Sequence, residues 1–384
     1  MEGLKNMAVG EVCSTISDTY RGNAGMVTLI NTSDVLEGKV LNHERVLNSN
    51  LKGQFKKVFQ KDDILYSEIR PQNKRFAYVD FIPTDYIAST KLMVIRAHVD
   101  KVMPKYLYYF LKSDTTITEL QMLAETRSGT FPQITFTELA NLTIPVPPIP
   151  IQAIIVETLG CIEKKIDYNK QVNDNLRQQA QALYKQCFPY RVDDDLPAGW
   201  RIGTVGEIIE IHDSKRIPLS GAERAKMEKK TYPYYGAAAL MDYVDDYIFD
   251  GKYLLLGEDG TVVDDAGYPI LQYVWGKFWV NNHAHILTGK LGFNVESLYM
   301  LFKQTPVKAI VTGAVQPKIS QANLRSIQVV IPPQKLLTDY NNQISPLFAL
   351  LRTNEEANQS LATLRDTLLP KLMSGEIDVS GIQF

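Results

Sequence analysis

The chain has 384 residues, 45% of them apolar, so it can form two or three domains with their own cores. Lys and Arg total 41 and Asp and Glu total 43, and the formal net charge is −2. This balance excludes a uniformly basic nucleic-acid coat protein but leaves room for local basic patches. The sequence has no signal-peptide core, no membrane-spanning apolar run and only scattered cysteines. We therefore expect a cytoplasmic protein with no membrane partner and no disulfide framework.

The first 148 residues are rich in strand-forming and turn-forming residues. Strands are predicted at Val58-Phe59, Ile64–Tyr66 and Leu92–Ile95, and a short helix at Val102–Leu111. The diproline Pro147-Pro148 closes this region. We interpret residues 1–148 as an α+β globule.

A long apolar repeat occupies residues 149–188. Apolar residues recur in steps of four and three from Ile155 to Cys187, with Asn169 and Asn173 on the same seam. This spacing predicts a coiled-coil helix of about 35 residues, roughly 50 Å long. An ordinary amphipathic core helix is the alternative reading of the pattern.

Residues 189–333 begin with a linker, Pro189–Trp200, and then return to strands and turns. Strands are predicted at Tyr253–Leu256, Phe278–Val280 and Ile327–Ile331, and a short helix at Glu296–Lys303. A second helix with the four-three spacing is predicted in residues 334–384, with Asn354 and Asn358 on its seam. Pro346 lies in its first part, where we expect a kink or a broken first segment.

The second half of the chain repeats the first. Pro-Gln-Ile-Thr at 132–135 matches Pro-Lys-Ile-Ser at 317–320, and both diprolines keep the same displacement. If a pseudo-two-fold axis relates the copies, the long helices run antiparallel. Asn169 then approaches Asn358, and Asn173 approaches Asn354. Such pairs would fix the register of the helices, whereas solvent-facing asparagines would not.

Several catalytic motifs are missing from the sequence. It has no phosphate-binding loop, no dinucleotide-binding loop and no Asn-Pro-Pro-aromatic motif of adenine methyltransferases. His283-Ala284-His285 could place two imidazoles on one face of a strand, but no third metal ligand is evident. A metal-dependent nucleic-acid enzyme built on Glu258-Asp259 and these histidines stays open as an alternative. A helical scaffold that binds only proteins is another.

Cations outnumber acids in two windows of the chain, and Arg and Lys there could bind DNA phosphates. The candidates in the first copy are Lys52, Lys56, Arg70, Lys74, Arg75 and Arg127. Those in the second copy are Lys215, Arg216, Arg224, Lys229, Tyr234, Tyr235 and Lys318. A solvated charged face is the simpler interpretation of each window. Two similar domains favour DNA, because a duplex offers two separated sites.

A set of short motifs recurs in order along the chain. They are Gly129, Pro132–Thr135, Leu139, Pro147-Pro148 and Gln152 in the first copy, Gly313, Gln316–Ser320, Leu324 and Pro332-Pro333 in the second, and also Tyr234–Ala237, Leu256–Gly260, Asn281–Ala284 and Leu372–Ile377. Together, over nearly the whole chain, they resemble the DNA-specificity subunit of type I restriction-modification enzymes.

The resemblance implies an α+β fold with an internal pseudo-two-fold repeat. Two α/β target-recognition domains, at 1–148 and 189–333, would be separated by two long antiparallel coiled-coil helices, at 149–188 and 334–384. Each domain would read one half of a bipartite site in double-stranded DNA. The implied partners are two adenine methyltransferase subunits, which restriction subunits can join. The resemblance implies no catalytic residue, no cofactor and no metal in this chain.

Overall fold

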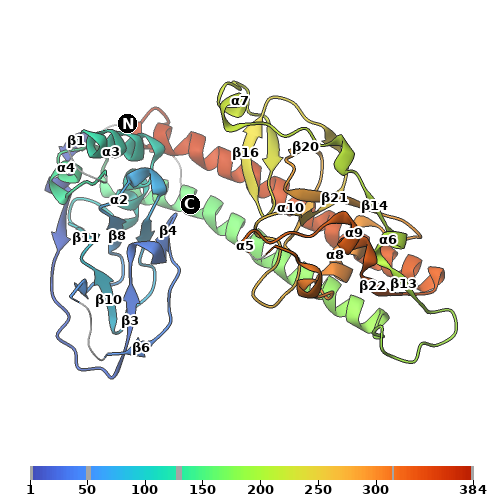
Figure 1. The fold of residues 1–384 in the computed structure, drawn as a ribbon. Helices are drawn as coiled ribbons and strands as arrows, with labels where there is room; N and C mark the ends of the chain where they lie inside the picture. Colours follow the sequence, from blue (N-terminus) through green and yellow to red (C-terminus); the bar gives the residue numbers. More distant parts are fainter. Residues whose placement is uncertain (1–2, 49–52, 127–131, 314, 382–384) are drawn as a thin grey trace. The chain divides into compact units, whose positions relative to one another are not determined.

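The computed structural model describes residues 3–48, 53–126, 132–313 and 315–381, which form two compact units (Figure 1). Unit 1 comprises Met1–Tyr168 and Ala357–Phe384, and unit 2 comprises Asn169–Glu356. Each unit therefore contains one globule and one half of each long helix. None of the helices in these described ranges is long and apolar enough to cross a membrane.

The described part of unit 1 is built on two four-stranded sheets. One has the antiparallel order β2-β11-β8-β9, and the other has the order β6-β3-β10-β7 with β3 and β10 parallel. The strands are β1 (Lys5–Ala8), β2 (Cys13–Ile16), β3 (Met26–Ile30), β4 (Val35–Leu36), β5 (Lys39–Val40), β6 (Val46–Leu47), β7 (Phe55–Lys57), β8 (Ile64–Ser67), β9 (Phe76–Tyr78), β10 (Tyr86–Ser89), β11 (Leu92–Ala97) and β12 (Thr143–Val146). The helices are α1 (Val9–Val12), η1 (Thr32–Asp34), η2 (Pro71–Asn73), α2 (Pro104–Leu111), α3 (Asp114–Glu125) and α4 (Phe136–Ala140).

The described part of unit 2 repeats this topology. Its sheets have the orders β14-β21-β18-β19 and β16-β15-β20-β17, and the second again has a parallel central pair. The strands are β13 (Arg201–Thr204), β14 (Ile209–Ile211), β15 (Tyr232–Tyr235), β16 (Leu240–Val244), β17 (Phe249–Asp250), β18 (Tyr253–Gly257), β19 (Leu271–Val274), β20 (Lys277–Val280), β21 (Ala284–Gly289) and β22 (Gln328–Ile331). The helices are α6 (Val205–Ile208), η3 (Asp213–Lys215), α7 (Gly221–Ala225), α8 (Val295–Phe302), η4 (Lys308–Ile310) and α9 (Gln321–Ser326). The internal repeat is thus confirmed in three dimensions.

The two long helices are α5 (Ile149–Cys187) and α10 (Gln334–Ser374). In unit 2 the Asn354 amide bonds to Asn173, and further along α5 the rings of Tyr184 and Tyr340 lie 5.6 Å apart. The later residue of α5, Tyr184, therefore contacts the earlier residue of α10, Tyr340. This order shows that the two helices run antiparallel. Seam residues near the ends of the helices are buried in the cores of the globules, such as Ile155 and Leu159 in unit 1 and Tyr340 and Ile344 in unit 2.

A broken first segment at Pro346 was the wrong expectation, because α10 runs through this residue without interruption. Pro346 is exposed, so the carbonyl that loses its helical partner can bond to water. Ile344 and Phe348 on either side are buried and hold the helix against unit 2.

The strand predicted at Val58-Phe59 was also wrong, because β7 ends at Lys57. Phe59 is buried in the core beside β8 and β11 without belonging to a sheet. The Val58 amide bonds to the carbonyl of Asp18, outside any strand. Burial without pairing produced a strand-like apolar signal here. The other predicted strands and both short helices lie within one or two residues of the observed elements.

Candidate nucleic-acid interface

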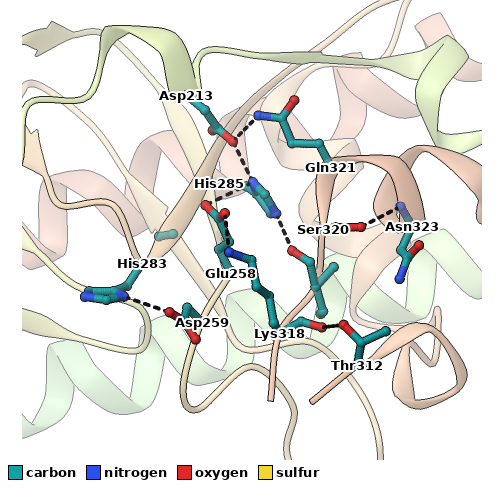
Figure 2. Close-up of polar contacts among 12 residues, drawn as sticks. Asp213, Glu258, Asp259, His283, His285, Thr312, Lys318, Ser320, Gln321 and Asn323 are labelled. Carbon is teal, nitrogen blue, oxygen red and sulfur yellow. Dashed lines mark hydrogen bonds and ion pairs between the residues drawn. The ribbon is translucent and has the colours of Figure 1, made fainter. Parts of the chain in front are cut away.

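Three motifs of the second copy meet at one end of the sheet β14-β21-β18-β19 (Figure 2). The Glu258 amide bonds to the carbonyl of His283, and the Ile319 amide bonds to the carbonyl of Glu258. The Gly260 amide bonds to the carbonyl of Pro317. These backbone bonds tie the end of β18 to the start of β21 and to the segment before α9. We call this arrangement the frame of unit 2.

His285 lies at the centre of this frame and is completely buried. Its Nδ1 lies 2.6 Å from Oδ2 of Asp213, and its Nε2 lies 2.8 Å from the carbonyl oxygen of Ile319. Asp213 opens η3, and its Oδ1 also accepts the Ile286 amide at 2.9 Å. Sequence reasoning missed Asp213, because no local spacing links it to a histidine on a distant strand.

Two cations balance the carboxylates of the frame. Arg216 lies 2.6 Å from Glu258 and 3.5 Å from Asp213, and Lys318 lies 3.5 Å from Glu258. Burial alone would raise the pKa of the Asp213 carboxyl, but His285, the Ile286 amide and Arg216 hold it below its ordinary value. Asp213 is therefore ionised at neutral pH, and the frame is a network of compensated charges.

The residues of the frame also show how well His283 and His285 could bind a metal ion. Ligand atoms of Asp213, Glu258 and His285 lie within 4.8 Å of one another, which is compatible with a metal site. However, Arg216 and Lys318 already occupy the Glu258 carboxylate, and a cation there would meet their repulsion. His283 precedes β21 and points to Asp259 instead, at 3.5 Å (Figure 2). The arrangement fits an ion-pair network better than a metal centre.

The frame supports a loop whose described residues are 312–313 and 315–318. Thr312 and Lys318 exchange backbone hydrogen bonds of 2.9 and 2.8 Å, which close the loop. Gly313 has a φ of +85°, and a Cβ atom there would lie 2.3 Å from the carbonyl oxygen of Gln316. The side chain of Val315 is fully exposed, and that of Lys318 is half exposed. This loop offers an apolar tip and a cation to solvent.

Unit 1 closes an equivalent frame with different side chains. The Ile134 amide bonds to the carbonyl of Glu68, the Arg70 amide to that of Pro132, and the Glu68 amide to that of Lys91. Met93 pairs with Tyr66 of β8 in the same way as His285 pairs with Leu256 of β18. Met93 therefore occupies in unit 1 the position that His285 occupies in unit 2. The candidates Lys52 and Arg127, and Gly129 of the matching loop, lie outside the described residues.

The other basic candidates of unit 1 lie on the surface. Arg70 and Lys74 flank η2, and both have left-handed backbones, with φ of 45° and 52°. Lys74 pairs with Asp114 at 2.9 Å, and Arg75 donates to the carbonyls of Ser33 and Val35. Lys56 is exposed on β7. Their contact with DNA stays a prediction.

The candidates of unit 2 divide into exposed and enclosed side chains. Lys215 and Lys229 are exposed, whereas Arg216 keeps only 13% of its side chain accessible. Arg224 pairs with Asp242 at 3.2 Å and lies over the ring of Tyr234.

The two tyrosine candidates turn inward. Tyr234 is buried, and its hydroxyl lies 3.2 Å from the Leu219 amide. Tyr235 packs against Phe278, and burial raises the pKa of its hydroxyl. Little of either tyrosine, or of Arg216, is available to a nucleic acid.

The asparagines of the long helices lie at or near buried seam positions. Asn169, Asn173 and Asn358 are buried. In unit 2, Asn173 accepts a hydrogen bond of 2.9 Å from the Asn354 amide and donates to the carbonyl of Leu351 and to Glu355. This bond supplies the polar partner that a buried amide requires. Its role in fixing the register stays a prediction.

Comparison with known proteins adds a decisive match. The type I restriction modification DNA specificity domain matches residues 1–178 and again residues 197–356. The chain belongs to this family.

Individual relatives agree with the family match. The type I restriction enzyme HindI specificity subunit of Haemophilus influenzae is 26% identical, over 98% of this chain and all of that protein. The MjaIX specificity subunit of Methanocaldococcus jannaschii is 25% identical over 74% of this chain and 71% of that protein. The S subunit of a type I system from M. genitalium has the same fold, with a TM-score of 0.54, 16% identity and 96% of each chain covered.

Membership of the DNA specificity family settles the class of function. The chain is a DNA-specificity subunit rather than a catalytic one, and its partners are DNA and the other subunits of the restriction-modification system. The two alternatives, a metal-dependent enzyme and a protein-binding scaffold, are not favoured. The frames of the two units are therefore parts of DNA-recognition domains.

Proposed function

We propose that the chain reads a bipartite DNA site, with residues 1–148 reading one half and residues 189–333 the other. The observation that supports this proposal is that the same backbone frame occurs in both units and is surrounded by different side chains. Two domains with one topology and different surfaces suit two different half-sites on one duplex. In this proposal two adenine methyltransferase subunits bind the specificity subunit, restriction subunits can join, and the assembly is cytoplasmic because its DNA is there.

The DNA-facing cations in this proposal are the exposed ones. Lys56, Arg70 and Lys74 serve the first half-site, and Lys215, Lys229 and Lys318 the second. Each would contact phosphates, which position the protein without reading bases. Arg216, Arg224 and Tyr234 take a supporting role instead, because their polar groups already bond within unit 2.

The helices at 149–188 and 334–384 act in this proposal as a spacer between the half-sites. The bond between Asn173 and Asn354 supports a fixed register, because a slipped helix would bury one amide without a partner. Four residues added to a helix lengthen it by about 6 Å. Such an insertion should shift the preferred gap by at most about two base pairs and leave both half-site sequences unchanged.

Methylome sequencing tests the proposal directly. Cells that carry the gene together with its methyltransferase gene should show a bipartite methylated-adenine motif, which disappears when this gene is deleted. Exchanging residues 1–148 for those of a relative should alter one half of the motif only. The matched control exchanges residues 189–333 and should alter the other half. A change in both halves after either exchange would contradict the division of labour.

A further inference from the structure

The turn that joins β8 to β9 in unit 1 has a backbone that only its surroundings can hold. Arg70 and Lys74, on the two sides of η2, have left-handed backbones with φ of 45° and 52°, although neither is a glycine. A Cβ atom disfavours this conformation, so it persists only where neighbouring structure enforces it, as happens at many functional sites. We call residues 70–74 the amide turn of unit 1.

Hydrogen bonds fix every backbone N–H of the amide turn. The Arg70 amide lies 3.1 Å from the carbonyl oxygen of Pro132, and the Gln72 amide lies 3.2 Å from Oε1 of Gln121 on α3. The last two amides of the turn each bond at 2.9 Å to the carbonyl three residues earlier. Gln121 is itself buried. Two elements of unit 1, α3 and the segment before α4, therefore hold the turn in place.

Two exposed side chains lie on this fixed backbone. Gln72 and Asn73 are both open to solvent, and within the described residues neither side-chain amide has a hydrogen-bond partner. A side chain on a fixed backbone loses less conformational freedom on binding than one on a mobile loop. The amide turn therefore presents two free amides in a preorganised position.

These amides have the chemistry that recognises adenine. A Gln or Asn amide offers a donor and an acceptor side by side, which match N7 and the N6 amino group of adenine in the major groove. Cations flank the pair, since Arg70 is exposed and Lys74 keeps 41% of its side chain accessible. Contacts of such cations with phosphates would place the two amides against base edges.

The matching connection of unit 2, between β18 and β19, carries different chemistry. Its sequence from Glu258 to Ile270 contains no Asn or Gln, and its exposed residues include Asp264 and Asp265. Two carboxylates at this position would be repelled by DNA phosphates. The chemistry of the amide turn thus belongs to one of the two half-site readers.

We propose that Gln72 and Asn73 are specificity-determining residues of unit 1, and that they read A·T pairs in the first half-site. The inference rests on the proposed function, since it takes unit 1 as the reader of that half-site. The adenine that becomes methylated is excluded, because methyltransferases turn their target base out of the duplex. The first half-site must therefore contain a further A·T pair.

Methylome sequencing gives the first test. The first half of the motif is the half that changes when residues 1–148 are exchanged, and it should contain an A·T pair besides the methylated one. A first half without such a pair would overturn the inference and leave the proposed function standing. If no bipartite motif appears, the proposed function fails, and the inference fails with it.

Binding by the assembled complex of the chain with its methyltransferase subunits gives the second test. Each first-half base pair is altered in turn, and the readout is the affinity for the cognate duplex divided by that for the altered duplex. In the double variant Gln72→Ala/Asn73→Ala, this ratio should fall about tenfold at one or two adjacent A·T pairs. The ratios for the second half should be those of the parent chain. Unchanged ratios throughout the first half would overturn the inference.

Gln60→Ala is the matched control. Gln60 is also an exposed amide of unit 1, but it precedes β8, whereas the amide turn follows that strand. This variant should keep every ratio of the parent chain. An equal loss at the same A·T pairs in Gln60→Ala would overturn the inference, because the effect would not belong to the amide turn.

A base analogue tests the contact itself. 7-Deazaadenine lacks the N7 acceptor but still pairs with thymine. Placed at the A·T pair identified above, it should weaken binding by the parent chain about tenfold and leave binding by the double variant unchanged. Equal weakening in both proteins, or none in the parent chain, would show that the amides do not read that adenine and would overturn the inference.

Discussion

Unit 1 and unit 2 close one backbone frame around different side chains. In both, the segment before a short helix bonds to the end of a central strand through the same amides and carbonyls. Unit 2 fills the frame with the ion network around His285, whereas unit 1 has Met93 at the paired position. The backbone bonds therefore do not depend on the side chains that they surround. This independence lets the recognition surface diverge while the fold is kept.

A second comparison concerns how each globule is held on its own end of the long helices. In unit 1 the carboxylate is Glu163 on α5, which bonds to Lys112 and to the Tyr109 hydroxyl of the α2 region. In unit 2 the carboxylate is Glu296 on α8, and the long helix supplies the cation, Arg352, at 3.4 Å. The signs are reversed between the units. Each globule is thus matched to its own helix end.

Removing the two anchoring carboxylates should have unequal effects, the largest that we predict. Glu296 is 1% exposed, and Lys252 lies 2.7 Å from it, whereas Glu163 is 22% exposed. Glu296→Gln should lower the free energy of unfolding by about 3 kcal/mol, because a buried carboxylate loses its charge-assisted bonds to Lys252 and Arg352. Glu163→Gln should cost about 1.5 kcal/mol, because water reaches its site.

Urea unfolding can separate the two effects. All three tryptophans, Trp200, Trp275 and Trp279, lie in unit 2, so their fluorescence reports on that unit. Glu296→Gln should shift the fluorescence transition, and Glu163→Gln should shift mainly the circular-dichroism signal. Equal shifts of fluorescence by both variants would show that the anchors do not belong to separate units.

The anchors also predict acid sensitivity. Burial opposes ionisation of Glu296 and Glu163, yet Lys252 and Tyr273 around the first and Lys112 and Tyr109 around the second hold both pKa values below the ordinary one. A carboxyl group whose pKa is lower in the folded state than in the unfolded state stabilises the fold at pH values above its unfolded-state pKa. This stability is lost as the pH falls through the folded-state pKa. The melting temperature should therefore drop below about pH 5. Glu296→Gln should flatten the drop in the fluorescence signal and leave the circular-dichroism drop from unit 1 in place.

A smaller and more local effect is expected at the loop on the unit 2 frame. Gly313 has a positive φ, and the Cβ added by Gly313→Ala would lie 2.3 Å from the carbonyl oxygen of Gln316. The loop must therefore change shape in this variant. Global stability should fall by only about 1 kcal/mol, but discrimination at the second half-site should be lost. Gly260→Ala is the matched control, because its φ is +91° but open space surrounds its Cβ position. If Gly313→Ala discriminates as well as the parent chain, the loop is not a reader.

The sequence predicted the parts of this fold that periodicity and repetition encode. The four-three spacing located α5 and α10, and the repeated Pro-x-Ile-Ser/Thr motif indicated that the second half of the chain repeats the first. It could not supply the partner of His285, because Asp213 reaches it only through sheet pairing between distant strands. Charge windows also do not distinguish an exposed cation from one enclosed by carboxylates. Arg216 shows this, since its neighbour Lys215 is free of that enclosure.

These two adjacent cations provide the finest comparison and the smallest predicted effect. Lys215 is exposed, so Lys215→Ala should leave stability unchanged and reduce the slope of log affinity against log salt by about one unit. Arg216→Ala should instead weaken unit 2 by about 2 kcal/mol, because Glu258 loses its nearest cation. Titrations of the assembled complex with its duplex at several salt concentrations, beside fluorescence-monitored unfolding, measure both quantities. A lowered slope for Arg216→Ala with unchanged stability would mean that its guanidinium reaches the phosphates after all, and that the frame of unit 2 opens when DNA binds.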